Sequence, residues 1–246
     1  MKNLKSPKHG LARILSKQGV CSRIEAQRRI LDGRVQVDGR VVRDPEFPVL
    51  VEHHAITVDG QALRPPSRVY LMLNKPRGLV TTTVDEQGRE TVYRCFDGAD
   101  LPWIAPVGRL DKASEGLLLF CNDPAWAAAI TGPSAGLDKT YHVQIDRIPD
   151  GALLTRLMTG IEVDGELLSA KSASLRRAGE KNAWLEIVLD EGRNRQIRRL
   201  LAAFDIAVLR LVRVAIGQLA LGGLAKGEWR ELTQDECDAL DLDVRR

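Results

Sequence analysis

The sequence predicts an α+β fold in which a small helix–helix–hairpin domain precedes a body built on a mixed, mostly antiparallel sheet. Two short helical patterns and a hairpin signal fall between residues 11 and 42, a proline pair follows, and many strand-like segments with few helices come after it. The 246 residues, 44% of them apolar, suffice for a small and a medium domain. We expect a basic arm at 1–10, a small domain at 11–63, a linker at 64–68 and the body at 69–246.

The first elements are two short helices with recognisable ends. Residues 11–18 carry a helical pattern, and Gly19 is a typical C-terminal stop. Ser22 and Glu25 form a capping box, in which the serine caps the helix and the glutamate occupies its third position. We expect this second helix to end at residues 32–33.

A hairpin completes the small domain. Residues 35–37 and 40–42 alternate apolar and polar side chains around Asp38 and Gly39. Asp-Gly tolerates the positive φ angles of a tight turn, so the pattern predicts two paired strands. A core of this size is marginal, and we expect it to depend on a second domain or on a ligand.

The charge is unevenly placed along the chain. Residues 1–68 carry 13 Lys and Arg against 7 Asp and Glu, whereas the remainder carries 23 against 26. A basic module beside a mildly acidic body indicates an anionic partner for the module. The alternative is that these side chains only solubilise the surface, and charge alone does not decide between the two.

The body is rich in candidate strands. Asp123 and Pro124 predict a helix start, and Asp164 with Gly165 predicts a tight hairpin turn. The expected strands are 69–73, 79–84, 116–121, 140–145, 160–163, 166–169, 183–189, 208–214 and 216–219. Many strands with few helices between them predict the mixed sheet of the body.

Composition excludes several classes of protein. No apolar run approaches the ~18 residues of a membrane span, and the first ten residues lack the apolar region of a secretory signal. The cysteines are scattered without CxxC pairing and are expected to be reduced thiols of a cytoplasmic protein; they are Cys21, Cys95, Cys121 and Cys237. The four histidines have no metal-ligand spacing, so we expect no metal site.

Asp111 is the most unusual residue of the body. It directly follows Arg109 and Leu110 and shortly precedes the apolar run that starts at Gly116. A buried strand rarely needs a charged neighbour. A carboxylate held at the edge of an apolar pocket can serve as a nucleophile, which makes Asp111 a candidate catalytic residue.

A cluster of arginines follows near residue 195. Arg195, Arg198 and Arg199 fall at helical spacing, on a different face from the apolar residues Ile197, Leu200, Leu201 and Phe204. Like charges at that spacing repel by a few tenths of a kcal/mol per pair, so an anionic partner is expected. Phosphate oxygens or an internal carboxylate such as Asp111 would serve. The alternative is a solvated face with glutamate partners.

Tyr141 begins an alternating strand pattern after Lys139 and Thr140. Alone this is a weak signal, because a tyrosine at a strand start is most often a packing residue. Beside a nucleophilic aspartate, the ring could stack on a base extruded from RNA.

Together these segments resemble the RsuA-type pseudouridine synthases, and the N-terminal module resembles an S4 RNA-binding domain. The similarity covers nearly the whole chain except the first ten residues and the acidic tail. The motifs that carry it, in order, are 74–78 (NKPRG), 108–119 (GRLDKASEGLLL), 139–141 (KTY), 192–200 (GRNRQIRRL) and 227–233 (GEWRELT). Asn194 and Arg195 stand before Gln196, where related families often carry His, which favours the RsuA-type branch.

The resemblance implies a role for each matching residue. Asp111 would act at the ribose C1′ of a target uridine, either through a covalent adduct or by abstracting the 2′ proton, and both routes stay open. Tyr141 would stack on the flipped base and take the C5 proton, and Arg198 would pair with Asp111 and hold it ionised. Ile197 would pack under the base, and Arg109 would hold the flipped-out conformation. Lys75 and Pro76 would be structural.

The resemblance also implies the partner and its location. We expect a cytoplasmic monomer that modifies ribosomal RNA or pre-ribosomal particles without cofactor, metal or membrane. Arg195 and Arg199 would contact the RNA beside the target. The S4-like arginines would contact phosphates, with about half of them touching RNA; they are Arg23, Arg28, Arg29 and Arg34. The alternatives are a non-catalytic RNA-binding or ribosome-assembly factor, and, more remotely, a scaffold that binds a small anion through residues 193–199.

Overall fold

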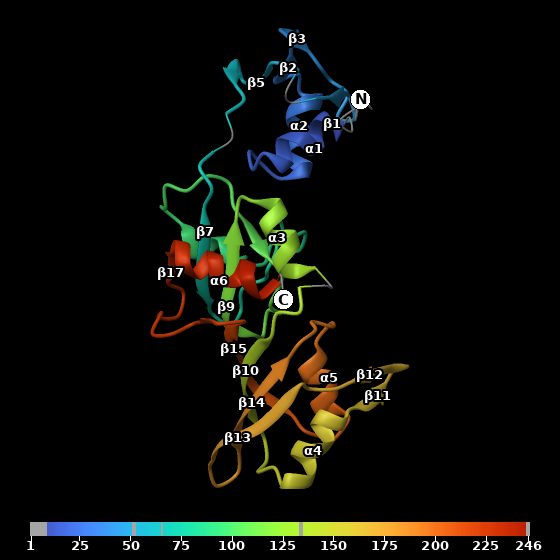
Figure 1. Ribbon diagram of the computed structural model, residues 1–246, viewed down its shortest axis with the longest axis vertical. Helices are drawn as coiled ribbons and strands as arrows, with labels where there is room; N and C mark the ends of the chain where they lie inside the picture. The colour runs from blue at the N-terminus through green and yellow to red at the C-terminus, as the bar shows by residue number, and fades with distance from the viewer. Residues whose placement is uncertain (1–8, 51–52, 65, 133–134, 245–246) are drawn as a thin grey trace. The chain divides into compact units, whose positions relative to one another are not determined.

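The computed structural model describes residues 9–50, 53–64, 66–132 and 135–244, and the chain divides into two compact units (Figure 1). One unit comprises the described residues up to Val69 together with Asp100–Ala105 and Cys121–Ala127, and the other comprises the rest. Most of the expected basic arm and part of the expected linker lie outside the described residues. His9 and Gly10 do not belong to an arm, because they form a strand that pairs with residues 48 and 49.

The N-terminal unit contains the predicted helices and hairpin. Its helices are α1 (Leu11–Lys17) and α2 (Arg23–Leu31), and its four-stranded sheet has the order β3-β2-β5-β6. The strands are β1 (His9–Gly10), β2 (Val35–Val37), β3 (Arg40–Val41), β4 (Pro48–Val49), β5 (Ile56–Val58) and β6 (Gln61–Ala62). Apolar side chains of both helices, β2 and β5 form one buried cluster.

Local signals fixed the ends of these elements. The serine cap of the predicted capping box is confirmed, since Ser22 Oγ accepts a hydrogen bond from Glu25 N at 3.1 Å, whereas the Glu25 carboxylate pairs with Arg28 and Arg29. The predicted turn at Asp38 and Gly39 is also confirmed, with φ angles of 50° and 75°. These are the left-handed values that an Asp-Gly turn supplies at little cost.

The second unit is built on a nine-stranded sheet with the order β13-β14-β10-β15-β9-β7-β17, to which β16 adds beside β15 and β8 beside β9. The sheet is mixed, as predicted, because β15 and β9 run parallel while β10 is antiparallel to both of its neighbours. Its strands are β7 (Tyr70–Lys75), β8 (Ala105–Val107), β9 (Glu115–Cys121), β10 (Lys139–Ile145), β13 (Ser172–Ala178), β14 (Ala183–Leu189), β15 (Val208–Ile216), β16 (Leu219–Ala220) and β17 (Trp229–Glu231).

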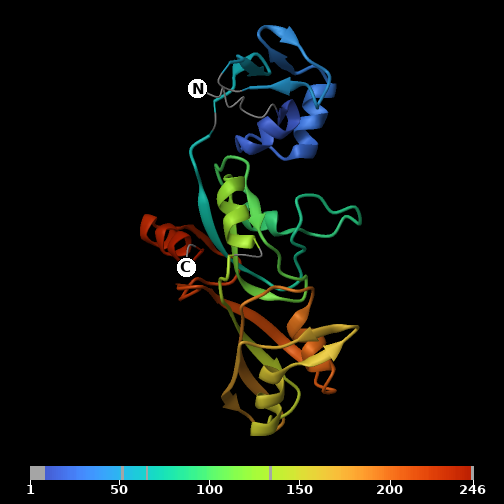
Figure 2. The same cartoon turned by 45° about the vertical axis from the view of Figure 1, so that its right-hand side comes forward.

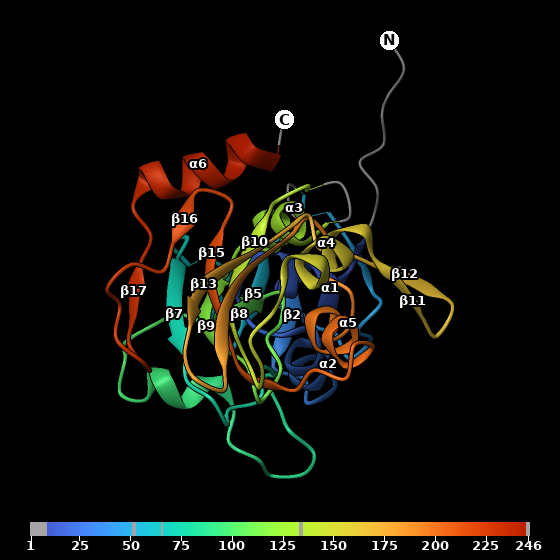
Figure 3. The same ribbon diagram turned by 90° about the horizontal axis from the view of Figure 1, so that it is seen from below.

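Helices and a small hairpin complete the description. They are η1 (Val92–Phe96), α3 (Pro124–Thr131), α4 (Gly151–Thr159), α5 (Gln196–Ala202), α6 (Gln234–Val244), β11 (Ile161–Val163) and β12 (Glu166–Leu168). Both α4 and α5 lie against the same face of β13, β14 and β10 (Figure 2), where their apolar residues form the largest buried cluster. The C-terminal helix α6 lies next to β16 (Figure 3).

Three predictions about the body were wrong or incomplete. Residues 79–84 form no strand. Val80 makes only an isolated bridge with Thr91, and the hydroxyl of Thr81 donates to the carbonyl oxygen of Leu110. Residues 208–216 form one continuous strand rather than two, with the turn at Gly217. Helices α4 and α6 and the edge strand β13 were not predicted, although Asp150 caps α4 by accepting from Leu153 N at 2.7 Å.

Candidate active site

The predicted catalytic carboxylate, Asp111, lies in the loop between β8 and β9, and a buried lysine holds this loop. Lys75 ends β7 and has no exposed surface. Its ammonium donates to the backbone oxygens of Asp111 at 3.1 Å, Ser114 at 2.8 Å and Pro76 at 3.2 Å. The structural role expected of Lys75 therefore takes a specific form, because its charge joins both ends of the Asp111 turn.

Two further groups from the segment after β7 bind the same turn. The hydroxyl of Thr81 donates to the carbonyl oxygen of Leu110 at 2.7 Å, and the amide of Gly78 donates to that of Lys112 at 2.8 Å. The carbonyl oxygens of residues 110, 111, 112 and 114 thus all accept hydrogen bonds, either from Lys75 or from the segment that follows it. Satisfied backbone groups on a loop restrict its motion, so the carboxylate is carried on a fixed turn.

Burial also changes the pKa of Lys75. Desolvation lowers the pKa of Lys75 to about 8, and the nearby charge of Asp111 opposes this shift. The Asp111 side chain, by contrast, is about one-third exposed, at 33%. The turn is thus held from beneath by a buried cation while its carboxylate faces an accessible space.

The sheet places the predicted base-stacking residue near this turn. Gly116, five residues after Asp111, pairs with Arg213 of β15, and Arg213 pairs with Tyr141 of β10. Two strand spacings separate Tyr141 from Gly116, which is about 10 Å. A side chain at Gly116 would meet the Arg213 carbonyl oxygen at 2.2 Å, and its φ is +101°, so only glycine permits this approach.

The cation that forms an ion pair with Asp111 is Arg195, at 3.8 Å. Arg195 does not lie on the helical face expected for it. It precedes α5 in a left-handed conformation, with φ 49° and ψ 32°, as the residue that caps the helix. Such a conformation is uncommon for a residue other than glycine and recurs at functional sites, where the surrounding structure imposes it.

Arg198 lies behind the Asp111 turn. Its guanidinium donates to the carbonyl oxygens of Ala113 at 3.2 Å and Val208 at 3.4 Å. Burial, together with the positive charges of Arg195 and Arg77, lowers the pKa of Arg198, while Asp111 opposes the shift. The expected direct pairing of Arg198 with Asp111 is thus replaced by a bond to the backbone of the turn, and among the described residues the ion pair belongs to Arg195.

Arg77 is a cation that the sequence interpretation did not assign. Its charge acts on Arg198, and its side chain is exposed. It stands between Pro76 and Gly78 in the first motif, which was interpreted only as structural. The position of that motif beside the Asp111 turn could not be seen before the strands were paired.

The other residues of α5 divide between core and surface contacts. Ile197 is buried in the large cluster, with 3% of its surface exposed. Arg199 forms ion pairs with Glu166 at 2.7 Å and Asp164 at 3.3 Å, both in the β11–β12 hairpin. Arg199 therefore has the carboxylate partners that the alternative interpretation of the arginine cluster expected. Contact of Arg199 with RNA stays a prediction.

The remaining candidate RNA contacts are exposed or paired. Arg109 is exposed beside the Asp111 turn and has no ion pair among the described residues. The S4-like arginines all have carboxylate partners: Arg23 with Glu46 at 3.2 Å, Arg28 and Arg29 with Glu25 at 3.2 and 2.9 Å, and Arg34 with Asp59 at 2.7 Å. Exposed pairs of this kind are weak and can exchange a carboxylate for a phosphate.

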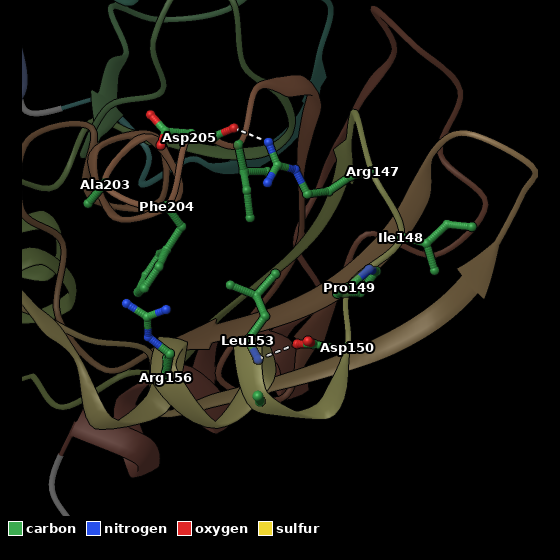
Figure 4. A pocket seen from close by; sticks show the side chains of 11 residues that line it. Arg147, Ile148, Pro149, Asp150, Leu153, Arg156, Ala203, Phe204 and Asp205 are labelled. Carbon is green, nitrogen blue, oxygen red and sulfur yellow. Dashed lines mark hydrogen bonds between the residues drawn. The ribbon is translucent and has the colours of Figure 1, made fainter.

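A separate pocket lies at the far end of β10 (Figure 4). Its volume is about 440 Å³, and it lies between the segment that leads into α4 and the end of α5. The central guanidinium carbon of Arg156 lies 4.4 Å from the centroid of the Phe204 ring, and Arg147 donates to the Asp205 carbonyl oxygen. The polar groups of this pocket are used in holding α4 and α5, and the pocket lies apart from Tyr141 at the other end of the strand.

Two classes of feature are absent from the described ranges. There, no cluster of three or more His, Cys, Asp or Glu side chains could hold a metal ion. Within the same ranges, all four cysteines are free thiols. Among the helices of the described chain, none is both long and apolar enough to cross a membrane.

The fold and this site define an RNA-modifying isomerase. Residues 69–203 match the family of RNA pseudouridylate synthases, and residues 10–54 match the S4 domain. The chain belongs to the RNA pseudouridine synthases, in the RsuA-type branch with an N-terminal S4 domain. The predicted resemblance and fold class are confirmed.

Individual relatives match along most of their length. The chain is 39% identical to an RNA pseudouridine synthase of Aquifex aeolicus over 93% of this chain and 92% of the relative. It is 36% identical to the ribosomal large subunit pseudouridine synthase B of Bacillus subtilis over 94% of both chains. A pseudouridylate synthase of known crystal structure superimposes with a TM-score of 0.66 at 30% identity, covering 96% of this chain and 100% of that one.

Proposed function

We propose that this pseudouridine synthase converts a specific uridine of ribosomal RNA, and that Asp111 is its catalytic residue. The observation that carries the proposal is the immobilised Asp111 turn, whose carboxylate is accessible and has the Arg195 guanidinium at 3.8 Å. A nearby cation stabilises negative charge on a carboxylate by Coulomb attraction. The name of the Bacillus subtilis relative supports ribosomal RNA as the substrate, with the large-subunit RNA as the first to test.

The reaction rearranges bonds within one nucleotide. The bond between C1′ and N1 breaks, the uracil rotates, and a bond forms between C1′ and C5. The proton of C5 leaves and N1 gains one, so atoms and electrons balance without an oxidant or reductant. Asp111 starts the sequence by adding to C1′ or by removing the 2′ proton, and it is regenerated at the end on either route.

Each neighbouring residue has a proposed task. Tyr141 stacks on the flipped uracil and accepts the C5 proton. Its pairing with Arg213, which itself pairs with Gly116 shortly after Asp111, supports this task. Ile197 packs against the same base, while Arg109 and Arg195 contact the flipped-out nucleotide. Unstacking the uridine costs a few kcal/mol, which phosphate contacts must offset.

The domains expected from the sequence have separate tasks in the proposal. Residues 11–63 act as the S4 module that positions the RNA, residues 64–68 connect, and residues 69–246 carry out the isomerisation. A subset of Arg23, Arg28, Arg29 and Arg34 contacts phosphates, and Arg199 adds a contact beside the target. Such contacts place the RNA without reading its sequence.

The test is the Asp111→Asn variant assayed on unmodified ribosomal RNA transcripts. Pseudouridine is mapped by carbodiimide-dependent primer extension, and we expect turnover to fall by about 10³-fold or more, as for other residues that act directly on the substrate. RNA affinity should be retained. The exposed Asp97→Asn variant is the matched control and should stay active. Normal turnover by Asp111→Asn would overturn the assignment of Asp111 as the catalytic residue, whereas absence of turnover by the unmodified protein would favour a non-catalytic RNA-binding factor.

A further inference from the structure

The sheet has a second polar face, opposite the one that α4 and α5 cover. Side chains alternate between the two faces of a strand. On the covered face lie the buried residues Val143, Ile145, Leu185 and Ile187, together with Tyr141. On the other face lie the half-buried residues His142, Gln144, Trp184 and Glu186. Any contact made by this second face is therefore additional to the contacts at Asp111 and Tyr141.

Four strands align a row of side chains on this face. Trp184 of β14 pairs with Arg177 of β13 on one side and with Gln144 of β10 on the other, and Gln144 pairs with Arg210 of β15. The Arg210 guanidinium reaches back over the row, with its central carbon 5.5 Å from the centroid of the Trp184 ring. The indole is thus bordered by guanidinium groups from two different strands.

The charge of the face is predominantly positive. Arg177 is exposed and makes no ion pair among the described residues. Arg176 pairs with Glu186 at 2.7 Å, and Arg210 pairs with the buried Glu115 at 3.1 Å. At least one full positive charge, that of Arg177, is left without a carboxylate partner beside the indole.

These residues line an open hollow of about 390 Å³, formed by His142, Arg176, Arg177 and Trp184. This volume lies within the range of small-ligand sites and can hold one nucleotide. Burial and the charge of Arg176 lower the pKa of His142, while Glu186 opposes the shift. The Nε2 of His142 lies 3.3 Å from the Glu186 carboxylate, so a neutral ring that donates to Glu186 leaves Nδ1 as an acceptor for a base edge. An aromatic platform with adjacent cations is the combination that binds single-stranded nucleic acid.

We propose that this face binds an unpaired nucleotide of the RNA substrate, outside the target uridine. Its base stacks on Trp184, and the adjoining phosphate is held by Arg177 with Arg176 beside it. The proposal rests on RNA being the substrate and is independent of which uridine is modified and of the role of Asp111. Positive charge favours RNA over an apolar peptide as the occupant.

The experiment measures binding of a fluorescein-labelled oligouridine of about 12 nucleotides by fluorescence anisotropy. Replacing Trp184 with alanine should raise Kd by about 5- to 150-fold, the usual effect of losing one stacked base, whereas Trp184→Phe should retain most of the affinity. Arg177→Gln should reduce the slope of log K against log salt by roughly one phosphate contact. On ribosomal RNA transcripts, both Trp184→Ala and Arg177→Gln should raise KM and leave kcat unchanged.

The control for Arg177→Gln is Arg94→Gln, which removes another exposed arginine and should leave the salt slope unchanged. Because Arg177 is exposed, the Arg177→Gln variant should fold normally and tests the proposal even if Trp184→Ala has a folding defect. If Trp184→Ala and Arg177→Gln both bind oligouridine within twofold of the unmodified protein, the proposal is wrong. It is equally wrong if RNA affinity is unchanged while the variants lose association with a protein partner. Because binding does not need turnover, its result stands whether or not Asp111→Asn is inactive.

Discussion

The buried charge of Lys75 gives the sharpest test of how the Asp111 turn is held. Lys75 is fully buried, and desolvation lowers its pKa from 10.5 to about 8. In the unfolded chain the same lysine keeps its ordinary pKa. At neutral pH the protein therefore keeps an ammonium group in a place that disfavours its charge, bonded to the carbonyl oxygens of Pro76, Asp111 and Ser114.

The consequence for stability follows from proton linkage. Between pH 8 and 10.5 the unfolded chain binds more protons at Lys75 than the folded protein does, so the free energy of unfolding rises with pH in this window. The whole difference between the two pKa values corresponds to about 3 kcal/mol. Between pH 7 and pH 10 the titration is incomplete, and the expected change is about 2.5 kcal/mol.

The perturbation is Lys75→Met, which keeps an unbranched side chain of similar length and removes the charge. Urea unfolding of this variant and of the unmodified protein, at several values between pH 7 and pH 10 under reducing conditions, gives two pH profiles. Subtracting them cancels the other titrating groups. The free energy of unfolding of the unmodified protein minus that of Lys75→Met should increase by about 2.5 kcal/mol between pH 7 and pH 10. Lys181→Met, which removes an exposed lysine, is the control and should follow the unmodified profile.

The same variant should lose activity, because the turn loses three hydrogen bonds. A displacement of about 1 Å at a catalytic group can cost about 10²-fold in rate, so we expect kcat to fall by roughly 10- to 100-fold at pH 7. Parallel pH profiles for Lys75→Met and the unmodified protein would refute the assignment of the lowered pKa. Unchanged kcat would refute the role of Lys75 in positioning Asp111.

Two further predictions concern the geometry of the site. Gly116→Ala should destabilise the fold by about 2–4 kcal/mol in urea unfolding, because the new methyl group would lie 2.2 Å from a β15 carbonyl oxygen at a φ of +101°. Gly88→Ala, at a positive φ but with open space around it, should cost clearly less, and equal losses would contradict the steric argument. Arg195→Gln should lower kcat, since this residue pairs with Asp111, while Arg199→Gln should lower the melting temperature slightly and leave kcat within about twofold. The opposite ranking of these two arginines in turnover assays would contradict the assignment of the ion pairs.

Sequence reasoning succeeded where the signal is local. The Ser22 cap of the second helix and the Asp-Gly turns at 38–39 and 164–165 are predicted from neighbouring residues, and all three form as expected. Residues 79–84 were interpreted as a strand because they are apolar and β-branched. Instead, the backbone of Val80 bonds to residues 90 and 92, and the Thr81 hydroxyl donates to Leu110 beside Asp111, a partner that is distant in the sequence.

The edge strand β13 was missed for a related reason. Most of its side chains are exposed, so it lacks the alternation of a half-buried strand, and only its pairing with β14 defines it. Helix α4 was missed although Asp150 and Gly160 mark its two ends.

At the site, two of the expected contacts differ from those in the structure, and the roles of the site residues stay predictions. Motif order singled out Asp111, Tyr141 and Arg198, and the sheet register brings Tyr141 within about 10 Å of the residue that follows the turn. Helical spacing placed Arg195 on the helix, whereas its left-handed φ places it before the helix and next to Asp111. A positive φ at an arginine has no sequence signal.

The different contacts of Arg195 and Arg198 give each of these two cations, three residues apart in this chain, a separate role. Arg198 is partly buried and bonds to the carbonyl oxygen of Ala113, so it completes the set of backbone bonds that Lys75 makes to Asp111 and Ser114. Arg195 is half exposed and reaches the carboxylate itself. A residue that holds the turn must be shielded from water, whereas a residue that meets the nucleotide must remain accessible. One arginine cannot satisfy both conditions, and the left-handed residue before α5 lets two neighbouring positions satisfy them separately.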